Sequence, residues 1–241
     1  MQTTTNKEKD PMGRAISDYF HTKKAGKLRV FSSMFYEDEI PVATLFRSFA
    51  EMPVQEQKAI ELSRGKVLDV GAGSGCHSII LKARGLETVA IDISELSVEV
   101  MKARDIDARN INFFDGTFTE KFDTILFAMN GIGIVGKIER LPDFFRSIKR
   151  LLAPGGQVLL DSSDIRYVFM DDDGGMDIDL AAGYYGEIDY KMRYKNITGE
   201  PFDWLYIDFD TLSMYAEEHG FICEKCIDGE HYDYLARITL K

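Results

Sequence analysis

The sequence predicts an α/β fold built on a doubly wound, mainly parallel sheet of seven strands. Three observations favour it. Short apolar runs alternate with helical segments from Lys66 to Asp161. A glycine-rich turn links the first of these runs to the next helix. Two extended runs joined at Asp228-Gly229-Glu230 end the chain as a hairpin. Because repeated βα units give parallel strands, helices are expected on both faces of the sheet.

Each expected element follows from the spacing of its apolar residues. Strands are expected at 67–70, 88–91, 111–114, 124–129, 157–160, 222–227 and 234–240. Helices are expected at 76–84, 94–104, 141–152 and 212–219, with Ser94 as an N-cap and Pro154-Gly155-Gly156 ending the third helix. The run 124–129 is almost wholly apolar, which is typical of a central strand.

The N-terminal region and one insertion depart from this alternation. Residues 1–60 are expected to form a tail and a helical cap, with residues 1–11 disordered. The cap would contain an amphipathic helix between Pro41 and Pro53. Residues 61–241 would form the main domain. Within it, 181–209 is expected to be an inserted antiparallel hairpin or lid, because 187–194 alternates and 204–209 is a second extended run.

Composition narrows the possible partners. The chain has 241 residues and a net charge of −11, which disfavours nucleic acids as substrates. No apolar run reaches the length of a membrane span, and Met1–Asp10 lacks the apolar stretch of a signal peptide. We therefore expect a cytoplasmic protein without a membrane partner. No metal is expected, because a zinc site would need a second pair beside Cys223 and Cys226, and only Cys76 remains.

The glycine-rich turn, Asp69-Val70-Gly71-Ala72-Gly73-Ser74-Gly75, is the strongest indication of a ligand. Glycines at alternate positions remove every Cβ from a backbone that passes close to another molecule. The first N–H groups of the following helix face the same space. A dinucleotide motif would have glycine where Cys76 stands. Alone, the turn leaves open an ordinary tight connection or a nicotinamide site.

Five motifs in order resemble the class I S-adenosylmethionine (SAM)-dependent methyltransferases. Residues 69–75 resemble motif I of that family. Asp92 and Asp115 stand where the family has an acidic residue at the end of its second strand and a polar residue at the end of its third. The family's fourth strand resembles Phe122-Asp123-Thr124-Ile125-Leu126, and the turn before its fifth strand resembles Leu151-Leu152-Ala153-Pro154-Gly155-Gly156. The match covers about residues 60–161 closely and the final hairpin by topology. The resemblance implies a Rossmann-like fold, SAM as cofactor, and methyl transfer.

The same resemblance implies a cofactor site. The glycine turn would lie against the methionyl and ribose parts, through Gly71, Ala72, Gly73 and Gly75. Asp92 would accept both ribose hydroxyls, since an ionised carboxylate has two oxygens. Asp115 would accept from the adenine amine. Asp69 would take the ammonium group, or it would only stabilise the turn. Ile93, Gly116, Met129 and Asn130 complete the predicted set.

Asn130 is the predicted catalytic residue. It follows the fourth strand in Met129-Asn130-Gly131, where the family's loop faces the transferred methyl group, and it could orient an amine or a hydroxyl. An ordinary Asn-Gly turn is the alternative. The expected methyl acceptor is a small molecule, with N- and O-methylation both open. A protein or peptide methyltransferase and a SAM-binding domain without transferase activity are the other hypotheses. Candidates for lining an acceptor pocket are Tyr19, Phe20, Asp161, Asp164, Tyr184, Tyr185 and Trp204. The acidic run Asp171–Asp173 would be a solvated lid, and His77 would be exposed or capping.

Overall fold

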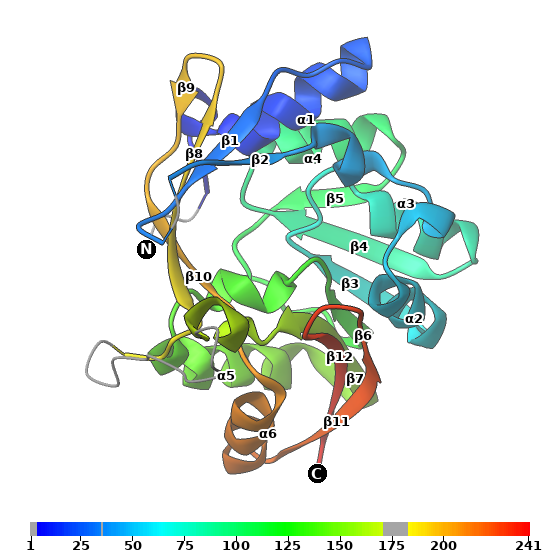
Figure 1. Ribbon diagram of the computed structural model, residues 1–241. Coiled ribbons are helices and arrows are strands. Elements are labelled where there is room, and N and C mark those ends of the chain that lie inside the picture. The colour runs from blue at the N-terminus through cyan, green and yellow to red at the C-terminus, as the bar shows by residue number, and fades with distance from the viewer. Residues whose placement is uncertain (1–3, 35, 171–182) are drawn as a thin grey trace.

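Residues 4–34, 36–170 and 183–241 are described by the computed structural model, in which two sheets lie side by side (Figure 1). The larger sheet has seven strands in the order β11-β12-β7-β6-β3-β4-β5. Its parallel strands are β3 (Lys66–Val70), β4 (Glu87–Asp92), β5 (Asp107–Asn110), β6 (Phe122–Phe127) and β7 (Leu152–Ser163). The final hairpin pairs β11 (Phe221–Asp228) with β12 (Asp233–Leu240), and β12 also runs antiparallel to β7. The predicted seven-stranded, mainly parallel fold is confirmed.

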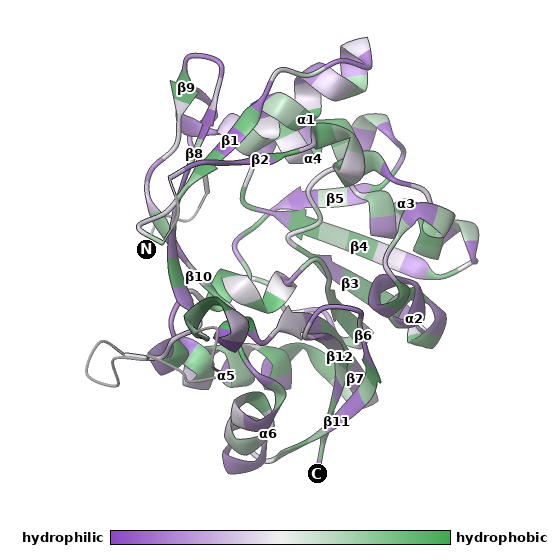
Figure 2. Cartoon of the chain, in the orientation of Figure 1, coloured by the Kyte–Doolittle hydropathy of each residue, from purple (hydrophilic) through white to green (hydrophobic). Residues whose placement is uncertain are grey.

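Helices cover both faces of this sheet. One face holds α2 (Val54–Leu62), α3 (Cys76–Ala83) and α4 (Glu95–Ala103), which pack on residues such as Val67, Ala90 and Leu126. The other face holds α5 (Leu141–Leu151) and α6 (Phe209–Glu218) in the largest apolar cluster. Figure 2 shows hydrophobic and hydrophilic residues alternating around α5 and α6, as expected for helices with one buried side. The four helices predicted from apolar spacing correspond to α3, α4, α5 and α6.

The smaller sheet was not predicted as such. Its antiparallel strands follow the order β10-β8-β1-β2, and β9 (Ile197–Thr198) also pairs with β8. The strands are β1 (Leu28–Phe31), β2 (Asp38–Ile40), β8 (Glu187–Tyr194) and β10 (Phe202–Leu205). The predicted hairpin at 181–209 therefore exists, but its strand β8 pairs with β1, which in turn pairs with β2. The sequence analysis expected these two N-terminal strands to be part of a helical cap. Residues 171–182, which include the acidic run Asp171–Asp173, lie outside the described residues.

The rest of the N-terminal region also differs from the prediction. The segment before α1 (Pro11–Thr22) is not a free tail, because Lys7–Lys9 form a 3₁₀ helix and the Thr5 amide donates to the Ile93 carbonyl over 2.9 Å. The helix expected between Pro41 and Pro53 is instead two 3₁₀ turns, Val42–Phe46 and Phe49–Glu51. Ser48 interrupts the periodic stripe, because it is extended and forms a capping box with Glu51.

Two strand positions need correction as well. The third parallel strand is Asp107–Asn110, four residues before the predicted 111–114. The apolar residues at 111–114 lie in a loop, and Phe113 is buried there in the core. The fourth strand runs from Phe122 to Phe127, so Met129 follows it instead of ending it.

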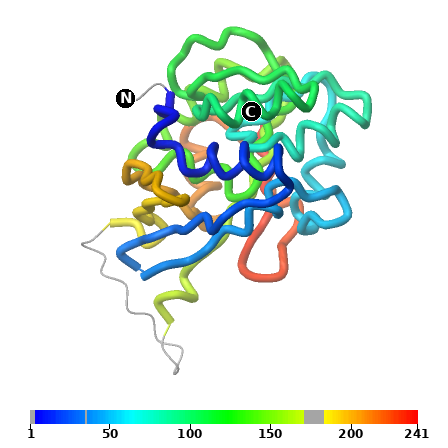
Figure 3. Tube along the Cα trace, turned by 90° about the horizontal axis from the view of Figure 1, so that it is seen from above, coloured from blue at the N-terminus to red at the C-terminus, as the bar shows by residue number. Residues whose placement is uncertain are grey.

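The smaller sheet stands opposite the carboxyl ends of the parallel strands, where the arrowheads of β3, β4 and β5 point toward it (Figure 1). Helix α1 joins the two parts through a cluster that includes Ile16, Leu28, Tyr194 and Val100 of α4. The view from above shows α1 running beside the strands of the N-terminal segment (Figure 3). Because residues on both sides of position 60 share the smaller sheet, the division of the chain into 1–60 and 61–241 stays a prediction. Of the helices within the described ranges, none has the length and apolar character needed to cross a membrane.

Candidate functional site

The glycine turn between β3 and α3 has two kinds of glycine. Gly71, Gly73 and Gly75 all have positive φ, at +68°, +56° and +79°, a conformation that glycine adopts at little cost. A Cβ on Gly75 would stand 2.4 Å from Ile106 Cδ1, so this glycine is required by packing inside the protein. A Cβ on Gly71 would meet no atom within 4 Å. The backbone at Gly71 therefore borders open space, as a ligand-contacting turn requires.

Asp92 ends β4 beside this turn, as predicted, and its carboxylate ties two loops together. Oδ2 accepts from the Gly73 amide and Oδ1 from the Ser94 amide, each over 2.8 Å. Burial raises the pKa of Asp92 to about 6, against the lowering effect of these two amides. Ile93 follows it with an exposed side chain. The arrangement leaves one acceptor position on each oxygen of Asp92 for a further donor.

Asp69 and Ala72 are buried beneath the turn. The Asp69 side chain is 1% exposed and accepts from the Ser78 hydroxyl of α3 over 2.6 Å. Burial raises the pKa of this carboxyl. Ala72 packs in the cluster formed by α4 and Ala90. Because Asp69 is buried and bonded to α3, its geometry favours a structural role over direct contact with a ligand.

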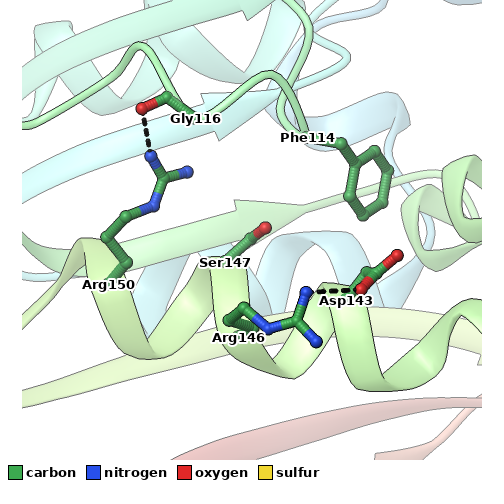
Figure 4. A pocket seen from close by; sticks show the side chains of 6 residues that line it. All are labelled: Phe114, Gly116, Asp143, Arg146, Ser147 and Arg150. Atoms are coloured by element: carbon green, nitrogen blue, oxygen red, sulfur yellow. Dashed lines mark hydrogen bonds and ion pairs between the residues drawn. The ribbon is translucent and has the colours of Figure 1, made fainter. Parts of the chain in front are cut away.

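Asp115 and Gly116 do not end a strand, because the strand closes at Asn110. The Asp115 carboxylate accepts from the amide and the hydroxyl of Thr117, over 3.0 and 2.8 Å. The Gly116 carbonyl accepts from Arg150 of α5, beside a pocket of about 350 Å³ that α5 shares with this loop (Figure 4). Asn110 is the polar residue that actually ends β5, and its side-chain amide donates to the Asp92 carbonyl over 3.0 Å. Sequence reasoning missed it, because the strand itself is polar.

Asn130 joins the two sheets. Met129 and Asn130 both have positive φ, at 61° and 54°. The Asn130 backbone amide donates to Asp161 of β7 over 2.9 Å, and its side-chain amide donates to the Leu205 carbonyl of β10 over 3.1 Å. The side-chain oxygen, Oδ1, is buried and has no hydrogen-bond partner among the described residues. An unpaired buried acceptor is costly, so this oxygen is suited to a donor on a bound molecule.

A buried charged network lies behind this loop. Glu56 of α2 accepts from Arg47, and its Oε2 lies 2.7 Å from His77 Nε2. His77 is 4% exposed, so the prediction of an exposed or capping residue was wrong. Burial opposes the charge on His77, but contacts with Cys76 and Glu56 raise its pKa well above the usual value. Burial, reinforced by the Glu56 charge, raises the pKa of Asp161 to about 7. The network fixes the segments that carry Asp161 and the glycine turn.

The N-terminal segment is fastened to the same edge of the sheet. Asp10 caps α1 by accepting from the Gly13 amide over 2.7 Å, and it also accepts from the Ser94 hydroxyl. Ser94 in turn caps α4, accepting from the Ser97 amide over 3.0 Å, as predicted. Ser94, two residues after Asp92, is therefore hydrogen-bonded both to the cap of α1 and to the first turn of α4.

The predicted pocket-lining residues separate into different surroundings. Tyr19 and Phe20 pack into the cluster between α1 and the smaller sheet. Tyr184 and Tyr185 donate to Asp208 and Asp164, over 2.6 and 2.8 Å. Trp204 is the predicted aromatic residue beside the Asn130 loop, since a Cβ on Gly133 would stand 2.1 Å from its indole. Over the described ranges, no three His, Cys, Asp or Glu side chains lie close enough together to hold a metal.

Comparison with known proteins decides the family. A model of the methyltransferase domain matches residues 67–156. The crystal structure of a SAM-dependent methyltransferase from Bacteroides fragilis, in complex with S-adenosyl-L-homocysteine (SAH), is 57% identical. It aligns over 100% of this chain and 99% of that chain with a TM-score of 0.94. The chain belongs to the SAM-dependent methyltransferase family. The cofactor of this methyltransferase is therefore SAM, and SAH is the corresponding product.

More distant relatives are also methyltransferases. The cypemycin N-terminal methyltransferase of a Streptomyces species is 34% identical over 102 residues, which cover 41% of this chain and 42% of that protein. The chain spans about half the length of the curated relatives it matches. The CcbJ methyltransferase of Streptomyces caelestis aligns over 98% of this chain and 99% of that chain at 14% identity and a TM-score of 0.66, which supports the fold alone.

Proposed function

We propose that this methyltransferase transfers the methyl group of SAM to a small molecule that carries an amine or a hydroxyl. The observation that carries the proposal is the position of Asn130. Its backbone is fixed to the parallel sheet through Asp161, and its side chain is fixed to the smaller sheet through Leu205. Its buried, unpartnered Oδ1 therefore lies where the cofactor-binding edge meets the smaller sheet.

The cofactor would lie over the glycine turn. Gly71 and Gly73 border space free of protein side chains, apart from Ile16 at 3.8 Å from a Cβ on Gly73. Asp92 has one free acceptor position on each oxygen for the two ribose hydroxyls. Ile93 would cover the adenine, because its exposed side chain follows Asp92 directly. The roles assigned to Asp115, Gly116 and Met129 rest on the resemblance to the family.

The chain's own contribution to the reaction is positioning. When bound, SAM supplies an electrophilic methyl group. The Asn130 Oδ1 would accept an N–H or O–H of the acceptor and so aim the lone pair of the nucleophile at that methyl group. Trp204 and the 3₁₀ helix Gly131–Val135 pack together beside Asn130 and exclude water there. An oriented, desolvated nucleophile needs little further catalysis for such a displacement.

A peptide N-terminus is the second candidate acceptor, because one relative is named as an N-terminal methyltransferase. That alignment covers only 41% of this chain. The smaller sheet contacts the Asn130 loop through Leu205, and α1 packs against the same sheet at Leu28 and Tyr194. Contacts at both places favour an enclosed site and a small acceptor.

Calorimetric titration with SAH, and with NAD in parallel, tests the cofactor site in this chain. Micromolar binding of SAH alone is expected. The acceptor class is then tested by incubating the protein with SAM labelled on the methyl group and two fractions of a cell extract, one of small molecules and one of peptides. Label in the small-molecule fraction supports the proposal. Label confined to peptides supports the second candidate, and binding without any transfer supports a SAM-binding domain.

A further inference from the structure

The face of β10 that touches the Asn130 loop is aromatic. Trp204 points to this loop, because a Cβ on Gly133 would stand 2.1 Å from the indole Nε1 and Cε2 atoms. Phe202 precedes Trp204 by two residues and Tyr206 follows it by two. In an extended chain such residues point to the same side, so the three rings form a row that begins at the loop.

Strand β8 extends this row. Tyr190 is directly opposite Phe202 in the β8–β10 pairing, with the ring centroids 6.0 Å apart. The Tyr190 hydroxyl lies 2.9 Å from the Tyr206 hydroxyl. Phe202 and Trp204 lie edge to face, with centroids 6.1 Å apart and ring planes at 80°. The four residues Tyr190, Phe202, Trp204 and Tyr206 therefore make one continuous patch, called the aromatic surface below.

The rings of β10 are not used to build the core. The described part of the chain forms four clusters of buried apolar residues, and Phe202, Trp204 and Tyr206 neither belong to these clusters nor pack against them. All three side chains are half-buried. Ile188, which is directly opposite Trp204, is by contrast 4% exposed. Large rings that stay outside a core and partly exposed are typical of a surface that binds another molecule.

The aromatic surface ends beside Asn130. Leu205, the residue after Trp204, accepts from the Asn130 side-chain amide over 3.1 Å. Gly133, on which the indole packs, donates its backbone amide to the Asn130 carbonyl over 2.9 Å. Asn130 thus bonds both to the residue that follows Trp204 and to the residue that Trp204 touches. A molecule lying against the indole is therefore next to the unpartnered Oδ1 of Asn130.

We propose that the aromatic surface binds the methyl acceptor through an aromatic ring, which lies against Trp204 and presents its hydroxyl or amine to Asn130. The proposal rests on the proposed function and deepens it by naming the acceptor class. Aromatic rings attract one another in offset-stacked and edge-to-face pairs, beyond the effect of the area that they bury. An aliphatic acceptor would gain nothing from half-buried rings that branched aliphatic side chains could not supply.

The transfer step balances with such an acceptor. A hydroxyl on the ring donates its hydrogen bond to the Asn130 Oδ1. Its oxygen lone pair forms the new O–C bond as the S–C bond of the sulfonium breaks, and the electron pair of that bond stays on sulfur. The proton of the hydroxyl passes to water, so the products are a methyl ether, SAH and a proton. An amine on the ring reacts in the same way through its nitrogen lone pair.

The test uses the protein saturated with SAH and two probes of similar shape, 2-phenylethanol and 2-cyclohexylethanol. Titration followed by saturation-transfer NMR measures the Kd of each. The phenyl probe is expected to bind about three- to tenfold more tightly, which is the gain from aromatic pairing. Burial of apolar area alone predicts the reverse order, because the cyclohexyl ring has more apolar surface than the phenyl ring. The ratio of the two Kd values therefore separates aromatic recognition from simple hydrophobic binding.

A second measurement places the probe. Trp204 is the single tryptophan of the chain, so indole fluorescence reports on this position alone. Binding of 2-phenylethanol against the indole displaces water and should shift the emission to shorter wavelength, with the same Kd as in the NMR titration. Binding that leaves the emission unchanged would locate the probe elsewhere and overturn the inference.

Substitutions test the role of the ring itself. In Trp204→Leu the ratio of the two Kd values should fall to about one, whereas Trp204→Phe keeps a ring and should retain the preference. Phe31→Leu is the matched control, because Phe31 is opposite Lys191, which neighbours Tyr190 and so points to the other face of the smaller sheet. It should leave the ratio unchanged. Thermal unfolding checks each variant, and Phe202→Leu replaces Trp204→Leu if the latter fails to fold.

Three results would overturn the inference. They are equal or tighter binding of the cyclohexyl probe, no binding of either probe, and equal effects of the leucine substitutions at the aromatic surface and at Phe31. Each is measured on protein that already holds SAH. Failure of the proposed function is distinct, since it would appear as absent SAH binding or absent methyl transfer in the earlier assays.

Discussion

Substitution of Asp92 by alanine tests the cofactor site most directly. The structure assigns one acceptor position on each Asp92 oxygen to a backbone amide, from Gly73 and Ser94. An ionised carboxylate has about four such positions, so one on each oxygen remains for a ribose hydroxyl. A hydrogen bond to a charged group contributes about 1.5–3 kcal/mol. Loss of two such bonds should weaken SAH binding by about 3–6 kcal/mol, which is roughly 10²–10⁴-fold in Kd.

Calorimetry with SAH measures this loss, and thermal unfolding shows whether the variant still folds. Asp228→Ala provides the control, since it removes an equal charge from the end of β11, at the far edge of the sheet, where its exposed carboxylate pairs with Lys225 over 2.9 Å. Its Kd should stay within about twofold of the unsubstituted protein. A folded Asp92→Ala protein that binds SAH within threefold of the original would refute the assignment of Asp92 to the ribose, and with it the position proposed for the cofactor.

Four further expectations concern pH, cofactor binding and stability. SAH binding should be constant above about pH 7 and about tenfold weaker at pH 5, because the pKa of Asp92 is raised to about 6 and its ionised form is the one that accepts hydroxyls; calorimetry across pH measures this. Gly75→Ala should lower stability by about 2–5 kcal/mol in thermal unfolding, because a Cβ there would stand 2.4 Å from a side-chain carbon at positive φ. Gly71→Ala should cost only about 1–2 kcal/mol but weaken SAH binding, since its Cβ would enter the open space. Glu56→Ala should destabilise the fold by about 3–5 kcal/mol in denaturant unfolding, because Arg47 and His77 would be left as buried cations; a loss no larger than that of the exposed Glu61→Ala would contradict this.

The parallel sheet could be predicted from sequence because its signals are local. Each strand from β3 to β7 is adjacent in the chain to a helix with a clear apolar stripe. Both the spacing of the apolar residues and the residues that end each element can be read within a few positions. The exception is β5, where Asp107-Ala108-Arg109-Asn110 has no apolar run. As the edge strand it pairs only with β4, and Ala108 is its one buried residue, so its sequence carries little of the usual pattern.

The smaller sheet could not be predicted because its pairing is not local. Leu28 pairs with Tyr194, which is far along the chain, and β2 has only three residues. Strands this short carry almost no periodicity of their own.

The charged network escaped sequence analysis for the same reason. It joins Arg47, Glu56 and His77 from three separate segments, and only the fold brings them together. For the candidate site, the positions of the glycine turn, Asp92 and Asn130 followed from the sequence, while the partners that fix Asn130 did not.

The long separation between β1 and β8 has a consequence for synthesis in the cell. At about 5–20 residues per second, Tyr194 leaves the ribosome roughly 10–30 s after Leu28, its partner across the two strands. In that interval β1 and β2 form at most an isolated hairpin, which is marginally stable in water. The nascent chain therefore completes the central βα units first, and the side proposed to receive the methyl acceptor is assembled among the last events of folding.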